Sequence, residues 1–412
     1  MGLSSRQTAL LAAVVLYAVG AWFHIPYGGG HIYSDIPTVF QNRECGGSCL
    51  SIPYVNGFVE YPVIVSLFMY LMGLGGSLLT NNILLGYYWL SVLVLAVPTL
   101  LLVDETVRIS AIVGSDGRRV LRYLVLTPTF VFVLLVNWYS IGVYFAIFGL
   151  RKLLEGNTRF SGFLVGISAA SNLVTAAPGI GMMLSLRNPR DMLRFAATAG
   201  LTFLAINGPF ILLNPQLFQQ FWAFHSNWYI EGSWMLALLP SSSDLRHYLF
   251  PATLIALLLA IFWLRKKVVV NRPIFLSWMS TSAFLFSTYV APPQTNLMLL
   301  PFFALLPITK RYREFFLFDL VNALVIVVGF SQPLWFLGIT YKIDMFSYSS
   351  IVQWMAIARS LWVGKLLFWD GFSGEVERRV LRRAIGEKRE EHPLLLEEST
   401  VQLRSKSSEV HP

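Results

Sequence analysis

Charged residues are scarce in this sequence. Only 13% of its 412 residues are charged and 55% are hydrophobic, whereas soluble domains carry about twice that charged fraction. This composition excludes a soluble catalytic domain. Runs of about 18 or more apolar residues recur from end to end instead, which predicts an all-α, polytopic membrane protein.

Other absences narrow the possible classes of protein further. The short alternating segments of a transmembrane barrel are missing, and no internal repeat is evident. The net charge of +9 does not indicate a nucleic-acid partner, because basic residues in a polytopic protein mark its inside loops. The two cysteines, Cys45 and Cys49, both lie in the first loop. A local disulfide, two free thiols and, less readily, a metal pair are compatible with them.

Lysine and arginine gather in a few segments, which we therefore expect inside. These are residues 108–122, 151–159, 187–194, 265–272, 310–313 and the tail from Arg378 onward. The breaks between them hold few basic residues and are expected outside. They are residues 24–60, 214–247, 291–296 and 341–350. We expect the first apolar run to be a retained span. The pattern predicts about twelve crossings with both termini inside.

The segment after the first outer loop interrupts this alternation. Two apolar stretches, residues 61–79 and 83–107, separate that loop from the inside segment at Arg108. Two full crossings would return the chain to the wrong side, so one stretch is expected to re-enter the membrane or to lie along its surface. We assign this role to residues 61–79, because their Tyr-Pro start and their glycines suit a short or broken helix packed against protein.

The first outer loop, residues 31–62, holds the strongest candidate for catalysis. Asp35 lies there in an aromatic and apolar setting, shortly after the first span. Such surroundings disfavour the charged form of a carboxyl group and suit a general base. Alternatively, Asp35 caps a short helix that starts at Pro37. An Asp35→Asn substitution separates the two interpretations, since Asn caps a helix about as well as Asp.

Further candidates are histidines and arginines near the outer loops. Several histidines, together with two carboxylates, could hold a divalent metal. These residues are His24, His31, His225, His247, Asp35 and Glu60. No ligand pair has a diagnostic spacing, so packing and hydrogen bonding are the simpler interpretation. Arg43 and Arg246 are candidates for binding an anionic phosphate, with a solvated surface position as the alternative.

Arg359 lies in the middle of the last apolar segment. A charge there is expensive and by default indicates function. Contact with a lipid phosphate would explain it, and so would snorkelling or an interfacial position of the segment.

Several motifs follow one another in a recognisable order. The first outer loop contains Tyr33-Ser34-Asp35, then Phe40, then Pro53-Tyr54, then Tyr61-Pro62. The later motifs are Asn137-Trp138, Gly162-x-x-x-Gly166, Asn207-Gly-Pro-Phe, Gly232-Ser233-Trp234, Pro293-Gln294 and Leu300-Pro301. In this order the chain resembles GT-C-class mannosyltransferases that use polyprenyl-phosphate-mannose. The closest likenesses are the catalytic subunit of the first GPI mannosyltransferase and its prokaryotic relatives.

The resemblance implies a GT-C-like fold and inverting transfer of a hexose, here mannose, from a polyprenyl or dolichyl phosphate to a glycolipid or glycan. Asp35 would act as the base, and no second carboxyl acid is needed because the lipid phosphate is a good leaving group. The expected substrate contacts are Tyr33, His31, Arg43, Glu60, Tyr61, Pro62, Asn137, His225 and Arg246. No cofactor is implied, although a divalent metal stays open.

This interpretation places residues 1–370 in one transmembrane domain with outer loops at 25–60 and 214–247. Residues 371–412 would form a charged, partly disordered inside tail. The protein would lie in the plasma membrane of a prokaryote or in the endoplasmic reticulum, with its site on the outer or lumenal face. A small membrane partner subunit is compatible with it. Tyr139 and Thr175 depart from the family pattern, which often has Asp and Lys there.

Other classes remain open. A lipid-linked saccharide flippase or a secondary transporter would place ionisable groups near the bilayer midplane, and Arg359 is the clear case here. An oligosaccharyltransferase is expected to carry a Trp-Trp-Asp signature and usually a large outer domain, which this sequence lacks. The lost charges at Tyr139 and Thr175 keep a non-catalytic subunit open as well.

Overall fold

The computed structural model describes residues 4–26, 32–41, 51–269, 271–330 and 350–382. This part of the chain is mostly helical and has no β-strand, only isolated bridges that pair Pro53 with Gly57 and Glu231 with Val290. The predicted all-α class is therefore confirmed for these residues. His31, Arg43, Cys45 and Cys49 lie outside them.

The described part of the chain forms the following helices. The first half of the chain forms α1 (Ser5–Phe23), α2 (Asp35–Val39), α3 (Val63–Leu79), α4 (Ile83–Ile112), α5 (Arg118–Val120), η2 (Leu121–Val125), α6 (Pro128–Phe132), η3 (Leu134–Val136), α7 (Tyr139–Leu154), α8 (Thr158–Ser171), η4 (Leu173–Ala176) and α9 (Ala177–Ser185). The second half forms α10 (Pro189–Leu213), α11 (Pro215–Ser226), η5 (Trp234–Ala237), α12 (Arg246–Leu264), α13 (Arg272–Ser287), η6 (Pro293–Met298), α14 (Leu300–Leu305), α15 (Tyr312–Leu324), η7 (Val325–Phe330), α16 (Ile351–Lys365) and η9 (Leu366–Phe372). Residues 375–382 of the tail are also helical.

Several helices have the length and composition of membrane spans. Five of the described helices qualify: α1, α4, α10, α12, and α16 together with η9. A sixth span results if the segments Arg118–Val125 and Pro128–Val136, bent by 52°, count as one. These helices mark the chain as a membrane protein. About twelve crossings stay a prediction, because helices such as α7 and α13 have 16 residues, roughly 24 Å against about 30 Å of hydrocarbon.

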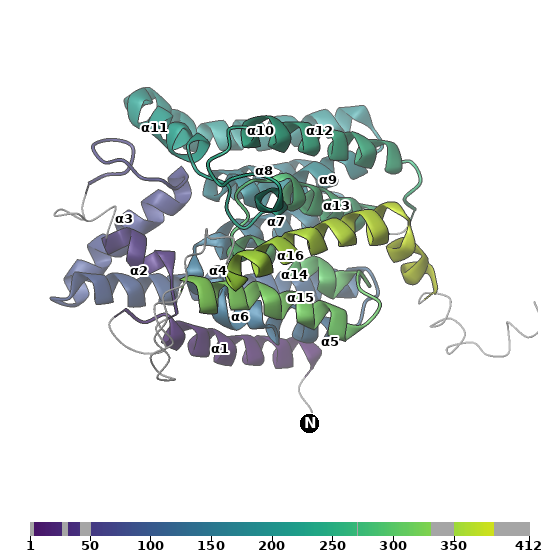
Figure 1. Ribbon diagram of the computed structural model, residues 1–412, viewed down its shortest axis with the longest axis horizontal. Coiled ribbons are helices and arrows are strands. Elements are labelled where there is room, and N and C mark those ends of the chain that lie inside the picture. The colour runs from purple at the N-terminus through teal and green to yellow at the C-terminus, as the bar shows by residue number, and fades with distance from the viewer. Residues whose placement is uncertain (1–3, 27–31, 42–50, 270, 331–349, 383–412) are drawn as a thin grey trace, which may run out of the picture.

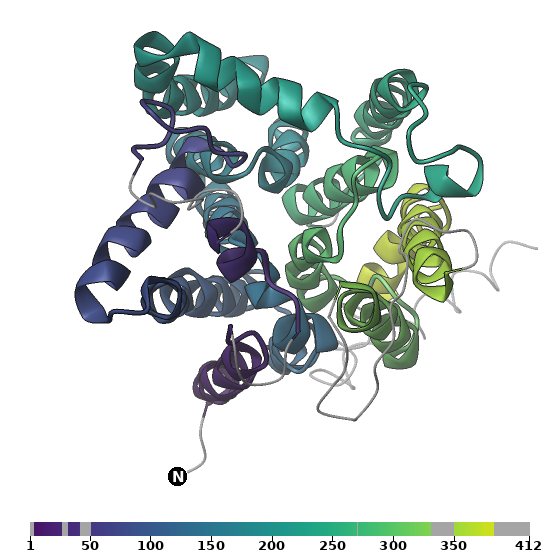
Figure 2. The ribbon, with the colours of Figure 1, turned by 60° about the vertical axis from the view of Figure 1, so that its left-hand side comes forward.

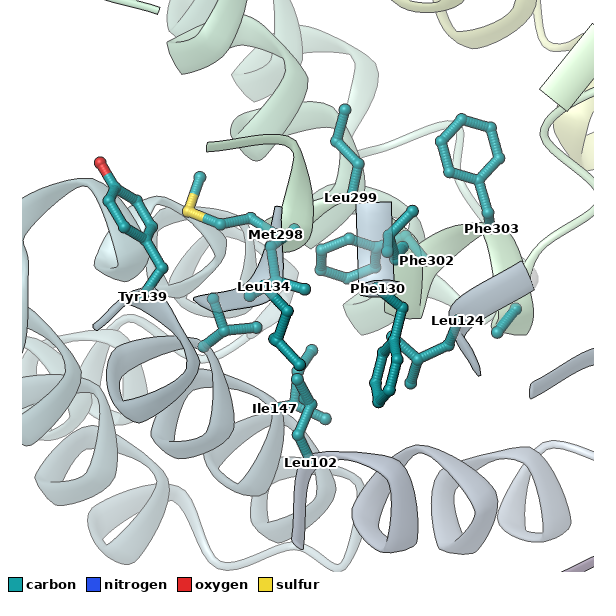
Figure 3. Packing of buried hydrophobic residues seen from close by; sticks show 14 of the residues in the cluster. Leu102, Leu124, Phe130, Leu134, Tyr139, Ile147, Met298, Leu299, Phe302 and Phe303 are labelled. Atoms are coloured by element: carbon teal, nitrogen blue, oxygen red, sulfur yellow. The ribbon is translucent and has the colours of Figure 1, made fainter. Parts of the chain in front are cut away.

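Eight helices contact one another in turn and close a ring around a buried segment. In order they are α1, α4, α7, α9, α13, α16, α15 and α6 (Figures 1 and 2). The enclosed segment is η6 with α14, whose residues are all buried. In the close view, Met298, Leu299, Phe302 and Phe303 lie beside apolar side chains of α4, η2, α6 and η3 (Figure 3). This apolar core makes the surrounding helices one packed bundle.

The predicted inside segments meet at one end of the bundle. Asp104 near the end of α4 accepts from Arg6 at 2.5 Å and from Arg108 at 2.8 Å. Arg151 at the end of α7 pairs with Glu105. The opposite end carries α2, α3 and α11, on the left of Figure 1. Two of the predicted inside segments, residues 108–122 and 151–159, thus lie together at the end of the bundle opposite to α2, α3 and α11.

Helix α3 lies obliquely at the end that carries α2 and α11 (Figure 1). It is a continuous helix of 17 residues, so the expected short helix is observed, and a break at the glycines is not. The glycines serve close packing against α4. A Cβ on Gly76 would lie 2.4 Å from the backbone nitrogen of Tyr87, so only glycine permits this approach.

Gly181→Ala is expected to destabilise the bundle. A Cβ on Gly181 of α9 would lie 2.1 Å from the Leu276 carbonyl oxygen of α13, and backbone cannot yield as a side chain does. Such overpacking costs about 1–3 kcal/mol. Gly200→Ala in α10 is the matched control, because nothing lies within 4 Å of the added carbon. Thermal unfolding in detergent should show a lower Tm for the first variant only, and equal Tm values for the two would contradict this packing.

Candidate functional site

Asp35 is the first residue of α2, and Ser34 caps that helix. The Ser34 hydroxyl accepts a hydrogen bond from the Ile36 nitrogen at 3.2 Å and donates one to the Leu135 carbonyl oxygen at 2.7 Å. It therefore starts the helix and fastens it to η3. The interpretation of Asp35 as the cap of a helix that starts at Pro37 is wrong, since the cap position lies one residue earlier.

The Asp35 carboxylate is the centre of a hydrogen-bonded cluster. The Tyr33 hydroxyl donates to Oδ1 at 2.6 Å. Asn137 Nδ2 donates to Oδ2 at 2.9 Å, and the Tyr61 hydroxyl donates to the same oxygen at 3.2 Å. Asp35 is half-buried, and these hydrogen bonds hold its carboxylate in place. Hydrogen bonds to a carboxylate favour its ionised form, which is the form that a base needs.

Tyr61 is itself held from several sides. Its carbonyl oxygen accepts from the Tyr54 hydroxyl and, at 2.6 Å, from the Ser66 hydroxyl. The Trp138 ring lies edge-on to the Tyr61 ring, with 4.7 Å between the two ring centroids. Burial, and next the charges of Asp35 and the buried Glu60, raise the pKa of Tyr61 well above its ordinary value. The phenol therefore keeps its proton and remains a hydrogen-bond donor to Asp35.

Three of the predicted contacts thus reach Asp35, namely Tyr33, Tyr61 and Asn137. Glu60 and Pro62 flank Tyr61, and Pro62 stands directly before α3. Two other predicted contacts, His225 and Arg246, bind their own segments and do not reach Asp35 by a described hydrogen bond. His225 Nδ1 lies 2.8 Å from the Phe221 carbonyl oxygen, one turn earlier in α11. Arg246 Nη1 donates to the Ser242 and Ser243 carbonyl oxygens and to Asp244.

The two positions that depart from the family pattern, Tyr139 and Thr175, hold buried neutral side chains. Tyr139 is 7% exposed and directly follows the Asn137-Trp138 pair. Thr175 is fully buried, and its hydroxyl donates to the Asn172 carbonyl oxygen at 2.7 Å. A Cβ on Gly142 would lie 2.1 Å from that hydroxyl. The space around Thr175 therefore has no room for a lysine.

The part of the chain that the structure describes brings no three histidine, cysteine, aspartate or glutamate side chains together as a metal site. His24 is buried, and its Nε2 has no hydrogen-bond partner among the described residues. Its Nδ1 lies 3.0 Å from the Ile32 carbonyl oxygen, and burial lowers its pKa to about 4. This neutral ring fits the simpler of the two interpretations of the outer histidines.

No protein-family model matches this chain, and no curated protein matches it. The likeness to GT-C mannosyltransferases therefore stays a prediction that rests on the quoted motifs.

Glu231 belongs to the expected outer segment 214–247, and no role was expected for it from the sequence. It is 7% exposed, and Trp228 Nε1 donates to its Oε2 at 2.8 Å. Burial raises the pKa of Glu231 and the charge of Asp35 raises it further, whereas the Trp228 hydrogen bond and the charge of Arg359 lower it. Glu231 and Asp35 thus lie close enough to repel each other. The neighbouring Gly232-Ser233-Trp234 motif was the signal that could have found it.

Glu231→Gln is expected to raise the thermal stability of the protein at neutral pH. The folded protein holds the pKa of Glu231 above its ordinary value of 4.5, so the folded state binds this proton more tightly than the unfolded state. Stability is then greatest below pH 4.5 and falls as the pH rises through the folded pKa. Gln cannot ionise, so the variant does not lose stability as the pH rises in this range. Melting curves should show a higher Tm for the variant at pH 7 and convergence near pH 4; a lower Tm at pH 7 would contradict the assignment.

Proposed function

We propose that this protein is an integral-membrane hexosyltransferase. It moves a hexose, mannose by the motif resemblance, from a polyprenyl or dolichyl phosphate to a glycolipid or glycan acceptor with inversion. The observation that carries the proposal is the half-buried Asp35 carboxylate, which Tyr33, Tyr61 and Asn137 hold by hydrogen bonds. Three donors on one accessible carboxylate orient a base and keep it ionised.

The proposed reaction needs one base and a good leaving group. Asp35 takes the proton of the acceptor hydroxyl, and the acceptor oxygen forms a bond to the anomeric carbon on the face opposite the phosphate. The bond between that carbon and the phosphate oxygen breaks, and the lipid phosphate leaves with the electron pair. Because a phosphate departs as a stable anion, the site needs no acid of the kind that a glycosidase uses.

The proposal includes a GT-C-like arrangement with about twelve crossings and α3 as the re-entrant or interfacial element. The basic segments at one end of the bundle support an inside position for that end, and Asp35 lies at the other end. The catalytic face is then the outside of a prokaryotic plasma membrane or the lumen of the endoplasmic reticulum. The partners are the lipid-phosphate sugar, the glycan acceptor and membrane lipid, and a small membrane subunit is compatible with this arrangement.

The donor class is tested with purified full-length protein in detergent. Labelled mannose and glucose are offered in two forms, as polyprenyl-phosphate sugars and as nucleotide sugars, together with a lipid extract that supplies acceptors. We expect label to move from a polyprenyl-phosphate sugar and not from the nucleotide sugars. Transfer from the nucleotide sugars alone would overturn the proposed donor class.

A further inference from the structure

Glu231 is held rigidly by its backbone. Its N–H donates to the Tyr289 carbonyl oxygen and its carbonyl oxygen accepts from the Ala291 N–H, both at 2.8 Å. Gly232 follows with φ +63°, where a Cβ would lie 2.5 Å from the Ala291 carbonyl oxygen. Arg359 donates to both the Gly232 and the Ala291 carbonyl oxygens. These bonds fix Glu231 in one orientation.

The Glu231 side chain is buried and only half satisfied. Oε2 accepts from Trp228 Nε1, whereas no described residue donates to Oε1 and no described lysine, arginine or histidine lies within ion-pair distance of the carboxylate. Oε1 is not fully buried, although the residue is only 7% exposed. An acceptor that is held in place and can still be reached suits a donor that a ligand brings.

The backbone of Glu231 is linked to the elements around Asp35. The chain that pairs with it, residues 289–291, continues directly into η6, and η6 packs against η3 and α7. Asn137, which binds Asp35, lies between those two elements. The charge of Asp35 also contributes to the raised pKa of Glu231. The two carboxylates are therefore near enough for their charges to interact.

We propose that Glu231 forms a sugar-binding subsite, in which its free oxygen accepts a hydrogen bond from a hydroxyl of the hexose brought to Asp35. The subsite rests on the proposed function, because the sugar it binds is the one transferred. Trp228 is a positioning residue, since its N–H holds the other oxygen. An ionised oxygen is the strongest acceptor available to a sugar hydroxyl, and the ligand would satisfy a group that the fold leaves unpaired.

Equilibrium binding measurements test this subsite independently of catalytic turnover. Wild-type protein in detergent is titrated with polyprenyl-phosphate-mannose and with sugar-free polyprenyl phosphate. We expect the sugar to tighten binding of the wild type by about 10- to 100-fold. Glu231→Gln should lose this difference, because Gln keeps the acceptor for Trp228 but presents an NH₂ group where the free oxygen was. Equal preference for the sugar in wild type and variant would overturn the subsite, as would no preference in the wild type.

Glu377→Gln is the matched control. Glu377 also accepts one N–H bond at 2.8 Å, from Val269, but it belongs to the tail helix and not to the proposed site. The Glu377→Gln variant should bind the two lipids as the wild type does. In the transfer assay, Glu231→Gln should raise KM for the lipid donor with a smaller effect on kcat. Sugar-dependent binding without any transfer would refute the proposed enzyme and keep the subsite, whereas transfer with normal KM in the variant would refute the subsite alone.

Discussion

Asp35→Asn is expected to reduce sugar transfer by about 10²- to 10⁴-fold, the usual contribution of a general base. Asn cannot take the acceptor proton. The fold should persist, because Asn keeps one oxygen to accept a hydrogen bond and the Tyr33 and Tyr61 hydroxyls can rotate to accept from its NH₂ group. Ser34 rather than Asp35 caps α2, so the helix start is not affected. Initial rates and Tm of the purified variant are the measurements.

Asp116→Asn is the control for this substitution. Asp116 is exposed at the basic end of the bundle, and its Oδ1 accepts from the Arg118 N–H at 2.9 Å, a bond that Asn preserves. Its transfer rate should equal that of the wild type. An Asp35→Asn protein that folds and keeps more than about a tenth of the rate would remove Asp35 from the role of base.

Arg359→Met is expected to prevent accumulation of folded protein. The guanidinium is 2% exposed and donates to Asn322 Oδ1 at 3.1 Å, to the Gly232 carbonyl oxygen at 2.9 Å and to the Ala291 carbonyl oxygen. Met leaves these acceptors buried without a donor, at about 1–3 kcal/mol each. That sum is a large part of the roughly 5–15 kcal/mol that stabilises a typical fold. Size-exclusion profiles from detergent extracts measure the loss.

Two further variants serve as comparisons for this prediction. Arg359→Lys keeps the charge but not the planar fork of donors, so we expect folded protein of intermediate Tm. Arg190→Met, at an exposed position on α10, should behave like the wild type. If Arg359→Met folded normally and lost only binding of the lipid donor, Arg359 would be a phosphate ligand and not the clamp between the outer loops and α16.

The local part of the site could be predicted from the sequence. Asp35, Tyr33 and Tyr61 belong to one polar loop between apolar runs, and the hydrophobic pattern alone shows that this loop lies at the end of a span. Asn137 is different, since 102 positions separate it from Asp35. Only the order of motifs indicated that it belongs to the same site.

Other parts of the site depend on tertiary contacts that leave no local pattern. The mid-span position of Arg359 suggested a lipid phosphate or the membrane surface. Its described partners are the carbonyl oxygens of two distant loops and the Asn322 side chain. Arg246 was a candidate for phosphate because it is one of few outer cations, and in the structure it bonds to the carbonyl oxygens of its own turn. Glu231 is held by pairing with residues 289–291, which no spacing in the sequence reveals.

The number of membrane crossings is also difficult to predict from the sequence. Hydropathy locates apolar stretches but not where a helix ends. The apolar stretch at residues 297–308, for example, is divided between the end of η6 and the six-residue α14. Pro301 cannot continue the hydrogen-bonding pattern of a preceding helix. The segment is buried by other helices, so its apolar character reflects the protein core as much as lipid.

The most direct test of the account is transfer of labelled mannose from polyprenyl-phosphate-mannose to endogenous glycolipid or glycan acceptors in membranes that carry wild type or Asp35→Asn at equal expression. The account predicts label in the acceptor fraction for the wild type and none above background for the variant. Absence of transfer by the wild type with mannose and with other hexoses as donor would contradict it, and would favour a carrier of lipid-linked saccharides or a non-catalytic subunit.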